Sequence, residues 1–146
     1  MHKYQAITAC VFLHKDGKLF LAKRAKTKKF LPDKFELPGG HIEFGESLEA
    51  GLTREIREEF NIEVEIGDIF YAFIYVSHDG EKHTVEIDYF AVMKDSKQKI
   101  TLNPEDHSEY KWVSEEEARR YFPAGDQEGI AIKRGFEILK NNKINN

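Results

Sequence analysis

The sequence is short of cysteine and of long apolar runs. Cys10 is its single cysteine, so no intramolecular disulfide can form, and a lone thiol suits a reducing compartment. Its place in the apolar run Ala9–Leu13 predicts a buried core residue rather than a nucleophile. The apolar stretch near the N-terminus is too short for a signal peptide, and no later stretch approaches the ~18 apolar residues of a membrane span. We therefore expect a cytoplasmic protein.

Basic residues are outnumbered by acidic ones. The chain has 22 Lys and Arg against 26 Asp and Glu, a net charge of −4. A protein that grips a nucleic acid polymer needs a broad basic footprint, so we expect no such partner and no membrane partner. A local basic cluster or a bound metal can override the global sign, so small anionic ligands stay compatible with the sequence.

The sequence contains no internal repeat, low-complexity block or Pro/Gly-rich linker. With 146 residues, 40% of them hydrophobic and 33% charged, it has the composition of one globular domain spanning residues 1–146. It leaves open whether the protein is a monomer or a homodimer.

Hydrophobic patterning predicts a mixture of strands and helices. We expect extended segments at Tyr4–Leu13, Leu19–Arg24, Phe35–Leu37, Val64–Val76, His83–Met93 and Glu109–Val113. Turns are expected at Asp16-Gly17, Pro38-Gly39-Gly40 and His78-Asp79-Gly80. Helices are expected at Ser47–Phe60, from Ser114 to a stop at Pro123, and at Gln127–Lys140, with a frayed tail at Asn141–Asn146. This order indicates an α/β fold with a sheet flanked by helices.

The first predicted helix carries its charges in an unusual place. With about 100° per residue and Glu55 at zero, Leu48 lies near ~20° and Leu52 near ~60°. Glu59 then lies near ~40° and Glu58 near ~−60°, so three carboxylates share the stripe that the leucines use for packing. A solvated acidic face would instead lie opposite the leucines.

A divalent cation explains this placement. Glu55 with Glu58 and with Glu59 form like-charge pairs that cost about 0.2–0.5 kcal/mol each when exposed. The repulsion grows where a core shields the charges from water. Mg²⁺ takes oxygen ligands, often a few carboxylates together with substrate phosphates, so we interpret the stripe as a metal site. The helical spacing of the acids argues against the alternating loop ligands of an EF-hand.

The same residues resemble a known family. The pattern G-x₅-E-x₇-R-E-U-x-E-E-x-G-U, with U apolar, is the Nudix box, and the chain matches it in register from Gly40 to Ile62. The matching residues are Gly40, Glu46, Arg54, Glu55, Ile56, Glu58, Glu59 and Ile62. The second glycine of the box is replaced by Asn61, which also tolerates a left-handed backbone, so we expect little loss of stability and none of chemistry. The resemblance implies an α/β/α sandwich around a mixed β-sheet.

The resemblance also implies an activity and its residues. A Nudix hydrolase cleaves a diphosphate linkage with the help of Mg²⁺, for which Mn²⁺ is a possible substitute. The metal-binding groups implied are Glu55, Glu58 and Glu59, helped by the carbonyl of Gly39 or Gly40. Arg54 resembles the arginine that orients a neighbouring glutamate, and Glu55 is our first choice of general base. Some relatives use an acid of a distal loop instead, for which the candidates are Glu105, Asp106 and Glu109.

The substrate is less strongly indicated than the reaction. Six basic residues lie between Lys23 and Lys34, and Arg24 is the best candidate among them to receive a phosphate, although a solvated loop explains most of the others. The loops resemble those of MutT-type nucleoside triphosphatases, which release a nucleoside monophosphate and pyrophosphate. The candidates to face the base are His41, Phe44, Tyr75 and Asp126, although ordinary core or sheet packing also explains the aromatic residues among them. The alternatives are dinucleoside polyphosphates, nucleotide sugars such as ADP-ribose, and a non-catalytic nucleotide sensor.

Overall fold

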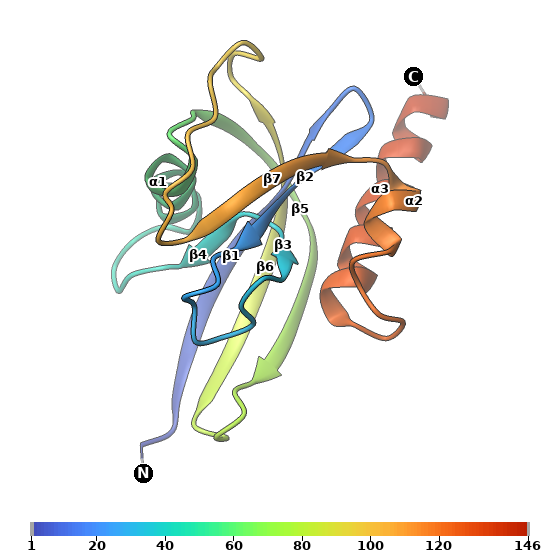
Figure 1. The fold of residues 1–146 in the computed structure, drawn as a ribbon. Helices are drawn as coiled ribbons and strands as arrows, with labels where there is room; N and C mark the ends of the chain where they lie inside the picture. The colour runs from blue at the N-terminus through green and yellow to red at the C-terminus, as the bar shows by residue number, and fades with distance from the viewer. Residues whose placement is uncertain (1, 146) are drawn as a thin grey trace.

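A mixed seven-stranded sheet organises the chain (Figure 1). The computed structural model describes residues 2–145. Its strands are β1 (Tyr4–Lys15), β2 (Lys18–Arg24), β3 (Phe35–Glu36), β4 (Gly39–His41), β5 (Val64–Val76), β6 (Lys82–Met93) and β7 (His107–Val113). Its helices are α1 (Leu48–Phe60), α2 (Glu115–Arg119) and α3 (Gln127–Asn145). Within the described residues, each helix is too short or too polar to span a bilayer.

The long strand β1 holds the sheet together. It pairs in parallel with β6 and antiparallel with β2 and β4, while β5 pairs with the far side of β6. The other neighbours of β2 are β3 and β7. Helix α1 lies on one side of the sheet, and α2 and α3 lie on the other (Figure 1). The predicted α/β sandwich around a mixed sheet is therefore confirmed.

Side chains of β1 alternate between two hydrophobic cores, as successive residues of a strand must. Ala9, Val11 and Leu13 are buried in the core beneath α1, which supplies Leu52, Ile56 and Phe60. Cys10 and Phe12 are buried in the second core, to which α3 contributes Ile132 and Phe136. The prediction that Cys10 is a core residue is confirmed.

Both predicted hairpins form. The turn between β1 and β2 has Asp16 at φ 53° and Gly17 at φ 77°, the two left-handed residues that a tight two-residue hairpin requires. The turn between β5 and β6 contains Gly80 at φ 77°, and the Asp79 side chain accepts hydrogen bonds from Ser77 and from the N–H of Glu81.

The glycine pair after Pro38 does not turn the chain as predicted. It continues as β4, in which Gly39 lies opposite Cys10 and Gly40 opposite Ala9. A Cβ at Gly39 would lie 2.1 Å from the carbonyl oxygen of Ala9, so glycine is needed there for close approach of two strands.

Two helix boundaries also differ from prediction. Helix α2 ends at Arg119, before Pro123 is reached. Helix α3 continues to Asn145, where a frayed tail was predicted from Asn141; Asn146 lies outside the described residues. An ion pair from Lys140 to Glu115 ties this part of α3 to α2 and supports the longer helix.

Both ends of α1 are capped by its own sequence. The hydroxyl of Ser47 accepts a hydrogen bond from the N–H of Ala50, as the N-cap prediction required. Asn61 ends the helix in a left-handed conformation, φ 55° and ψ 38°, and its N–H donates to the carbonyl of Arg57. The backbone of Asn61 therefore adopts the conformation expected at the second glycine of the Nudix box.

Because Asn61 already adopts this conformation, the variant Asn61→Gly should unfold within about 1 kcal/mol of the parent chain. Asn61→Ala should lose about 1–2 kcal/mol, because a left-handed backbone is costly for alanine. Urea denaturation followed by circular dichroism measures both values. Equal stability of the alanine variant and the parent would contradict the capping role.

Candidate active site

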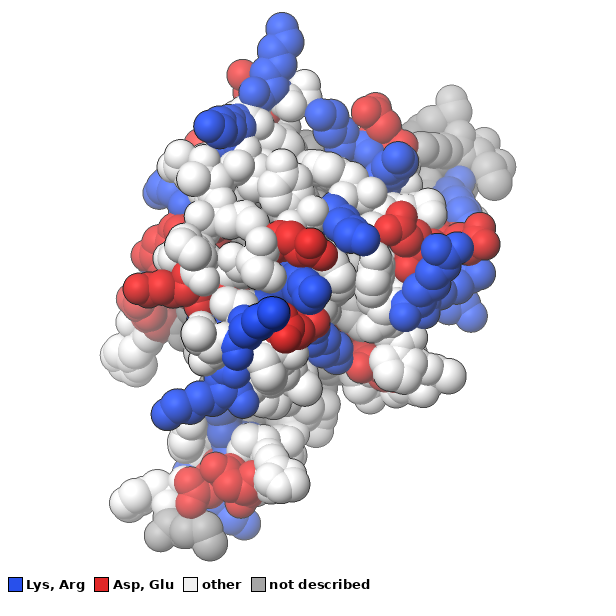
Figure 2. All heavy atoms as spheres, viewed as in Figure 1, with Lys and Arg blue, Asp and Glu red and all other residues white. Residues whose placement is uncertain are grey.

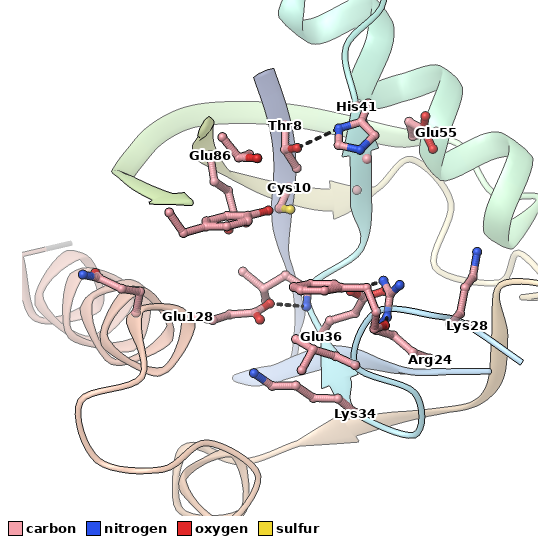
Figure 3. Close-up of a pocket in the computed structure, with 18 of the residues that line it drawn as sticks. Thr8, Cys10, Arg24, Lys28, Lys34, Glu36, His41, Glu55, Glu86 and Glu128 are labelled. Atoms are coloured by element: carbon pink, nitrogen blue, oxygen red, sulfur yellow. Dashed lines mark hydrogen bonds and ion pairs between the residues drawn. The ribbon is translucent and has the colours of Figure 1, made fainter. Parts of the chain in front are cut away.

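A cavity of about 720 Å³ lies against strands β1, β4 and β6, and acidic side chains line both of its ends. Glu55 and Glu59 of α1 line one end, and Glu86 of β6 and Glu128 of α3 line the other. Figure 3 shows Glu55 on one side of this cavity and Glu86 and Glu128 on the opposite side, with Cys10 between them. A cavity of this size accommodates a small-molecule ligand.

Glu55 lies directly against the backbone of β4. A Cβ added to Gly40 would come within 2.5 Å of the Glu55 carboxyl carbon, so the glycine leaves room for that carboxylate. Burial raises the pKa of Glu55 above its ordinary value, and Arg54, whose Nη1 donates to the carboxylate at 3.1 Å, opposes the rise. Glu55 is thus half-buried and held between a cation and a glycine.

Glu59 has the less favourable surroundings of the two acids. Its Oε2 is buried and has no hydrogen-bond partner among the described residues. Burial first, and then the charges of Glu55, Asp106 and Glu36, raise the pKa of Glu59 to about 9. An ionised carboxylate in this position needs a cation, because burying a charge without a partner is costly.

Glu58 is placed differently from its two neighbours. Its side chain is 59% exposed, and it accepts a hydrogen bond from Arg54 at 3.3 Å. Arg54 also donates to Glu46 at 2.7 Å and to the carbonyl of His41 at 3.2 Å. It therefore joins the loop before α1 to the acidic face of the helix.

Glu46 lies at the loop–helix junction, the place expected for it. It accepts hydrogen bonds from Arg54 and from the N–H of Glu43, and the Arg54 hydrogen bond lowers the pKa of Glu46 to about 2. This acid is engaged in holding the arginine.

The acids of α1 fit a divalent cation. An orphaned, buried oxygen on Glu59, a neighbouring carboxylate on Glu55 and hard oxygen donors throughout are the features that Mg²⁺ prefers. The carbonyl of Gly40 is on the strand that Glu55 touches, and Gly40 lines the cavity. Acidic side chains also gather over α1 and the loop before it, at the left of Figure 2.

The distal loop brings one of its three predicted acids to the cavity. Asp106 lines it, whereas Glu105 and Glu109 are exposed and do not belong to its wall. The loop is held on the end of α1 because Asn103 donates its N–H to the carbonyl of Glu59 at 3.2 Å.

Three cations of the loop between β2 and β3 and its flanks line the cavity, each in an ion pair with an acid. The pairs are Arg24 with Glu36 at 3.1 Å, Lys28 with Asp106 at 2.8 Å and Lys34 with Asp126 at 3.1 Å. The cavity wall thus contains a basic side as well as an acidic one, as Figure 3 shows for Arg24, Lys28 and Lys34.

The predicted base-facing residues separate into two groups. His41, Tyr75 and Asp126 line the cavity. Phe44 does not: its side chain is fully exposed on the loop before α1. The prediction that Phe44 faces a base is not supported, because the loop points its aromatic ring into solvent.

Known proteins resemble this chain both in sequence and in fold. A model of the NUDIX domain matches residues 3–132. The nucleoside triphosphatase NudI of Salmonella paratyphi B is 31% identical over 124 residues, which cover 80% of this chain and 87% of that protein. The MutT protein from Methanosarcina mazei Go1 superposes with a TM-score of 0.75 at 25% identity, covering 100% of this chain and 99% of its own. An Ap4A hydrolase from C. elegans shares the fold, with a TM-score of 0.73 at 20% identity over 94% of this chain and 98% of its own.

The chain belongs to the Nudix family. The family model covers most of the chain, and the box residues extend from Gly40 of β4 through the following loop and α1 to Ile62. The chain is a Nudix hydrolase, which confirms the expected enzyme class and disfavours the non-catalytic sensor.

Several polar residues of this Nudix site were missed by the sequence analysis. Glu36 receives hydrogen bonds from Arg24 and from His107, whose Nε2–H donates at 2.9 Å. Glu86 and Glu128 complete the far end of the cavity. The sequence contains little signal for Glu86, because it and Asp88 occupy the polar positions of a regular polar/apolar alternation in β6, a pattern typical of an exposed strand face.

The contact between Gly40 and Glu55 can be tested directly. Gly40→Ala should displace the Glu55 carboxylate and lower both turnover and Mn²⁺ affinity, by about 10²-fold for a shift near 1 Å. Gly80→Ala is the control, because this turn glycine has no neighbour within 4 Å and its cost is confined to its own positive φ. Steady-state kinetics and calorimetric Mn²⁺ titration measure the effects. An unchanged Gly40→Ala enzyme would remove the proposed fit of Glu55.

Proposed function

We propose that this Nudix hydrolase is a Mg²⁺-dependent pyrophosphohydrolase that converts a nucleoside triphosphate to a monophosphate and pyrophosphate. The observation that carries the proposal is the partly buried pair of carboxyl groups on Glu55 and Glu59, which lacks sufficient positive charge and lies beside a cavity that has a basic wall. A diphosphate bridge repels nucleophiles through its negative oxygens, so its cleavage requires both features.

The metal would be held by the acids of α1. Glu55, Glu58 and Glu59 are the proposed carboxylate ligands, with the carbonyl of Gly40 as a further oxygen donor; Mn²⁺ would be an acceptable substitute. When bound, the divalent ion neutralises phosphate charge and lowers the pKa of a coordinated water. Arg54 holds both Glu55 and Glu58 by hydrogen bonds, which supports a role in orienting the carboxylates.

The basic wall would receive the phosphates. Arg24 is fixed by Glu36 and by the carbonyl of Phe30, to which its Nε donates at 2.8 Å, and it presents a rigid guanidinium to the cavity. Lys28 and Lys34 are flexible point charges beside it. Because each cation is paired with an acid, this wall is close to neutral without a ligand. An incoming triphosphate would compete with those acids for the same N–H donors.

The general base is proposed to be Glu55. Its pKa is raised by burial, and an acid with a raised pKa accepts a proton more readily. Asp106 is the second candidate, since it is the distal-loop acid that reaches the cavity. Asp106 is already engaged in an ion pair with Lys28 at 2.8 Å, which favours Glu55.

The choice of substrate follows from the relatives. The 31% identical relative is named a nucleoside triphosphatase, which supports a triphosphate for this chain. The Ap4A hydrolase and a UDP-X diphosphatase share only the fold at 20% and 14% identity, so dinucleoside polyphosphates and nucleotide sugars are the second choice.

Replacing the proposed ligands should separate activity from folding. Glu59→Gln or Glu58→Gln should lower turnover by at least about 10²-fold, because each removes a proposed ligand charge. Metal-free Glu59→Gln should also unfold at a higher temperature than the parent chain at neutral pH, because the raised pKa of Glu59 means that folding must protonate this carboxyl group, a cost that the amide does not carry. Glu65→Gln, on the exposed side of β5, is the matched control.

Turnover, Mn²⁺ calorimetry and thermal unfolding measure these effects. Activity near that of the parent chain in both Glu58→Gln and Glu59→Gln would remove the metal assignment.

A substrate panel tests the leaving group. With Mg²⁺, nucleoside triphosphates should be cleaved faster than dinucleoside polyphosphates or ADP-ribose, and chromatography should identify a monophosphate and pyrophosphate as products. EDTA should abolish the reaction and added Mg²⁺ should restore it. Faster cleavage of ADP-ribose would overturn the substrate and leave the metal mechanism standing.

A further inference from the structure

A second acidic group lies at the end of the cavity opposite α1. Glu86 and Asp88 are two residues apart on β6 and therefore point to the same face of the sheet. One carboxylate oxygen from each and the sulfur of Cys10 all lie within 4.8 Å of one another. Glu86 is 6% exposed and Asp88 is 0% exposed, so both acids have lost their water.

These acids have more acceptors than the protein satisfies. Oε2 of Glu86, both oxygens of Asp88 and the hydroxyl of Thr84 are buried without a hydrogen-bond partner among the described residues. Burial is the main cause that raises the pKa of Glu86 to about 10 and the pKa of Asp88 to about 7, so Glu86 keeps its proton at neutral pH. A protonated carboxyl group donates through one oxygen and can still accept a hydrogen bond through the other.

Of the two acids, Glu86 is the one on the cavity side. Glu86 and Thr84 line it, whereas Asp88 does not belong to its wall. An unsatisfied buried acceptor costs free energy that a donor from a ligand recovers. The ligand group at this end should therefore carry N–H or O–H.

Neighbours from the other elements reinforce this preference. From α3, Glu128 adds a second carboxyl group, whose Oε1 accepts from the N–H of Leu37 at 2.8 Å. Burial and the nearby acids raise its pKa, while Lys34 opposes the rise. From β5, Tyr75 has its pKa raised to about 12, mainly by burial, so its hydroxyl stays protonated. The carboxyl oxygens of Glu86 and Glu128 are therefore the main hydrogen-bond acceptors at this end of the cavity.

We propose that Glu86 recognises the substrate by accepting a hydrogen bond from an exocyclic amino group of its base. The inference rests on the proposed function, in which the phosphates lie toward Glu55 and the basic wall. Figure 3 shows Glu86 and Glu128 on the side of the cavity away from Glu55, where the base of such a substrate would lie. Guanine, adenine and cytosine present an exocyclic amino group, whereas hypoxanthine has only hydrogen in place of the 2-amino group of guanine and uracil has a carbonyl oxygen in place of the 4-amino group of cytosine.

A metal ion is the rival occupant of this end. Cys10, Glu86 and Asp88 include ligand types that a transition metal accepts. It would require all three groups to lose their protons in a site where burial favours the protonated forms of the thiol and of both acids. The amino-group donor requires no such ionisation and is favoured.

Nucleotide pairs that differ in the amino group test the proposal by binding alone. Calorimetry in EDTA compares GTP with ITP, which lacks only the 2-amino group, and CTP with UTP. In at least one pair the amino member should bind about tenfold more tightly, as expected for one well-placed hydrogen bond to an acid. Glu86→Leu should remove this difference while leaving the dissociation constant of the member without the amino group (ITP or UTP) within about twofold.

Asp88→Asn is the matched control. Its amide is neutral and close in size to the carboxyl group of Asp88, so Glu86 should keep its place and the preference for the amino member should persist. Thermal unfolding confirms that each variant is folded; if Glu86→Leu does not fold, Glu86→Ala replaces it in the same comparison.

Three results would overturn the proposal. The first is the lack of any difference within both pairs up to millimolar nucleotide. The second is a difference that survives in the folded Glu86 variant. The third is a thiolate–Co²⁺ absorption band on titration with Co²⁺ that is lost in Cys10→Ser, which would assign the group to a metal. A clear amino preference with no triphosphate cleavage in Mg²⁺ would instead support the recognition and refute the proposed activity.

Discussion

The packing of α1 on β1 keeps two glutamates out of water. Leu52, Ile56 and Phe60 bind the helix to the sheet, and Glu55 and Glu59 occupy the border of the same stripe. The helix cannot turn these acids into solvent without exposing its apolar residues, which would each cost about 1.5–3 kcal/mol. The core therefore keeps the two carboxyl groups in an unfavourable environment. A bound cation would relieve this cost, and the relief would contribute to the free energy of cation binding.

Arg54 limits this repulsion without removing it. The guanidinium contacts Glu46, Glu55 and Glu58, yet none of its hydrogen bonds reaches the buried oxygen of Glu59. The cations Arg24, Lys28 and Lys34 are each engaged with another acid of the cavity wall. The protein therefore distributes its positive charge around the cavity and leaves the acids of α1 undercompensated, which is the condition that a metal site in this position requires.

The acids of α1 could be predicted from the sequence because helical periodicity relates residues that are close in the chain. The same local reasoning identified Ser47 and Asn61 as caps. Glu36, Glu86 and Glu128 could not be placed, because they meet only through the parallel pairing of β1 with β6 and the packing of α3. Phe44 shows the converse limit: a residue inside a well-defined motif can still point into solvent when its loop has no core to pack against.

The two acidic ends of the cavity differ in how they handle charge. At α1, a buried oxygen of Glu59 has no hydrogen-bond partner among the described residues and further carboxyl groups lie beside it, so the missing partner is a cation. At β6, burial raises the pKa of Glu86 to about 10, so its carboxyl group stays neutral and presents a hydrogen-bond acceptor. A nucleotide has the same polarity, with anionic phosphates at one end and a neutral base at the other. Glu55 and Glu59 are one helical turn apart, whereas Glu86 and Asp88 occupy adjacent positions on one face of a strand. This difference in spacing gives one acidic cavity two chemically different ends.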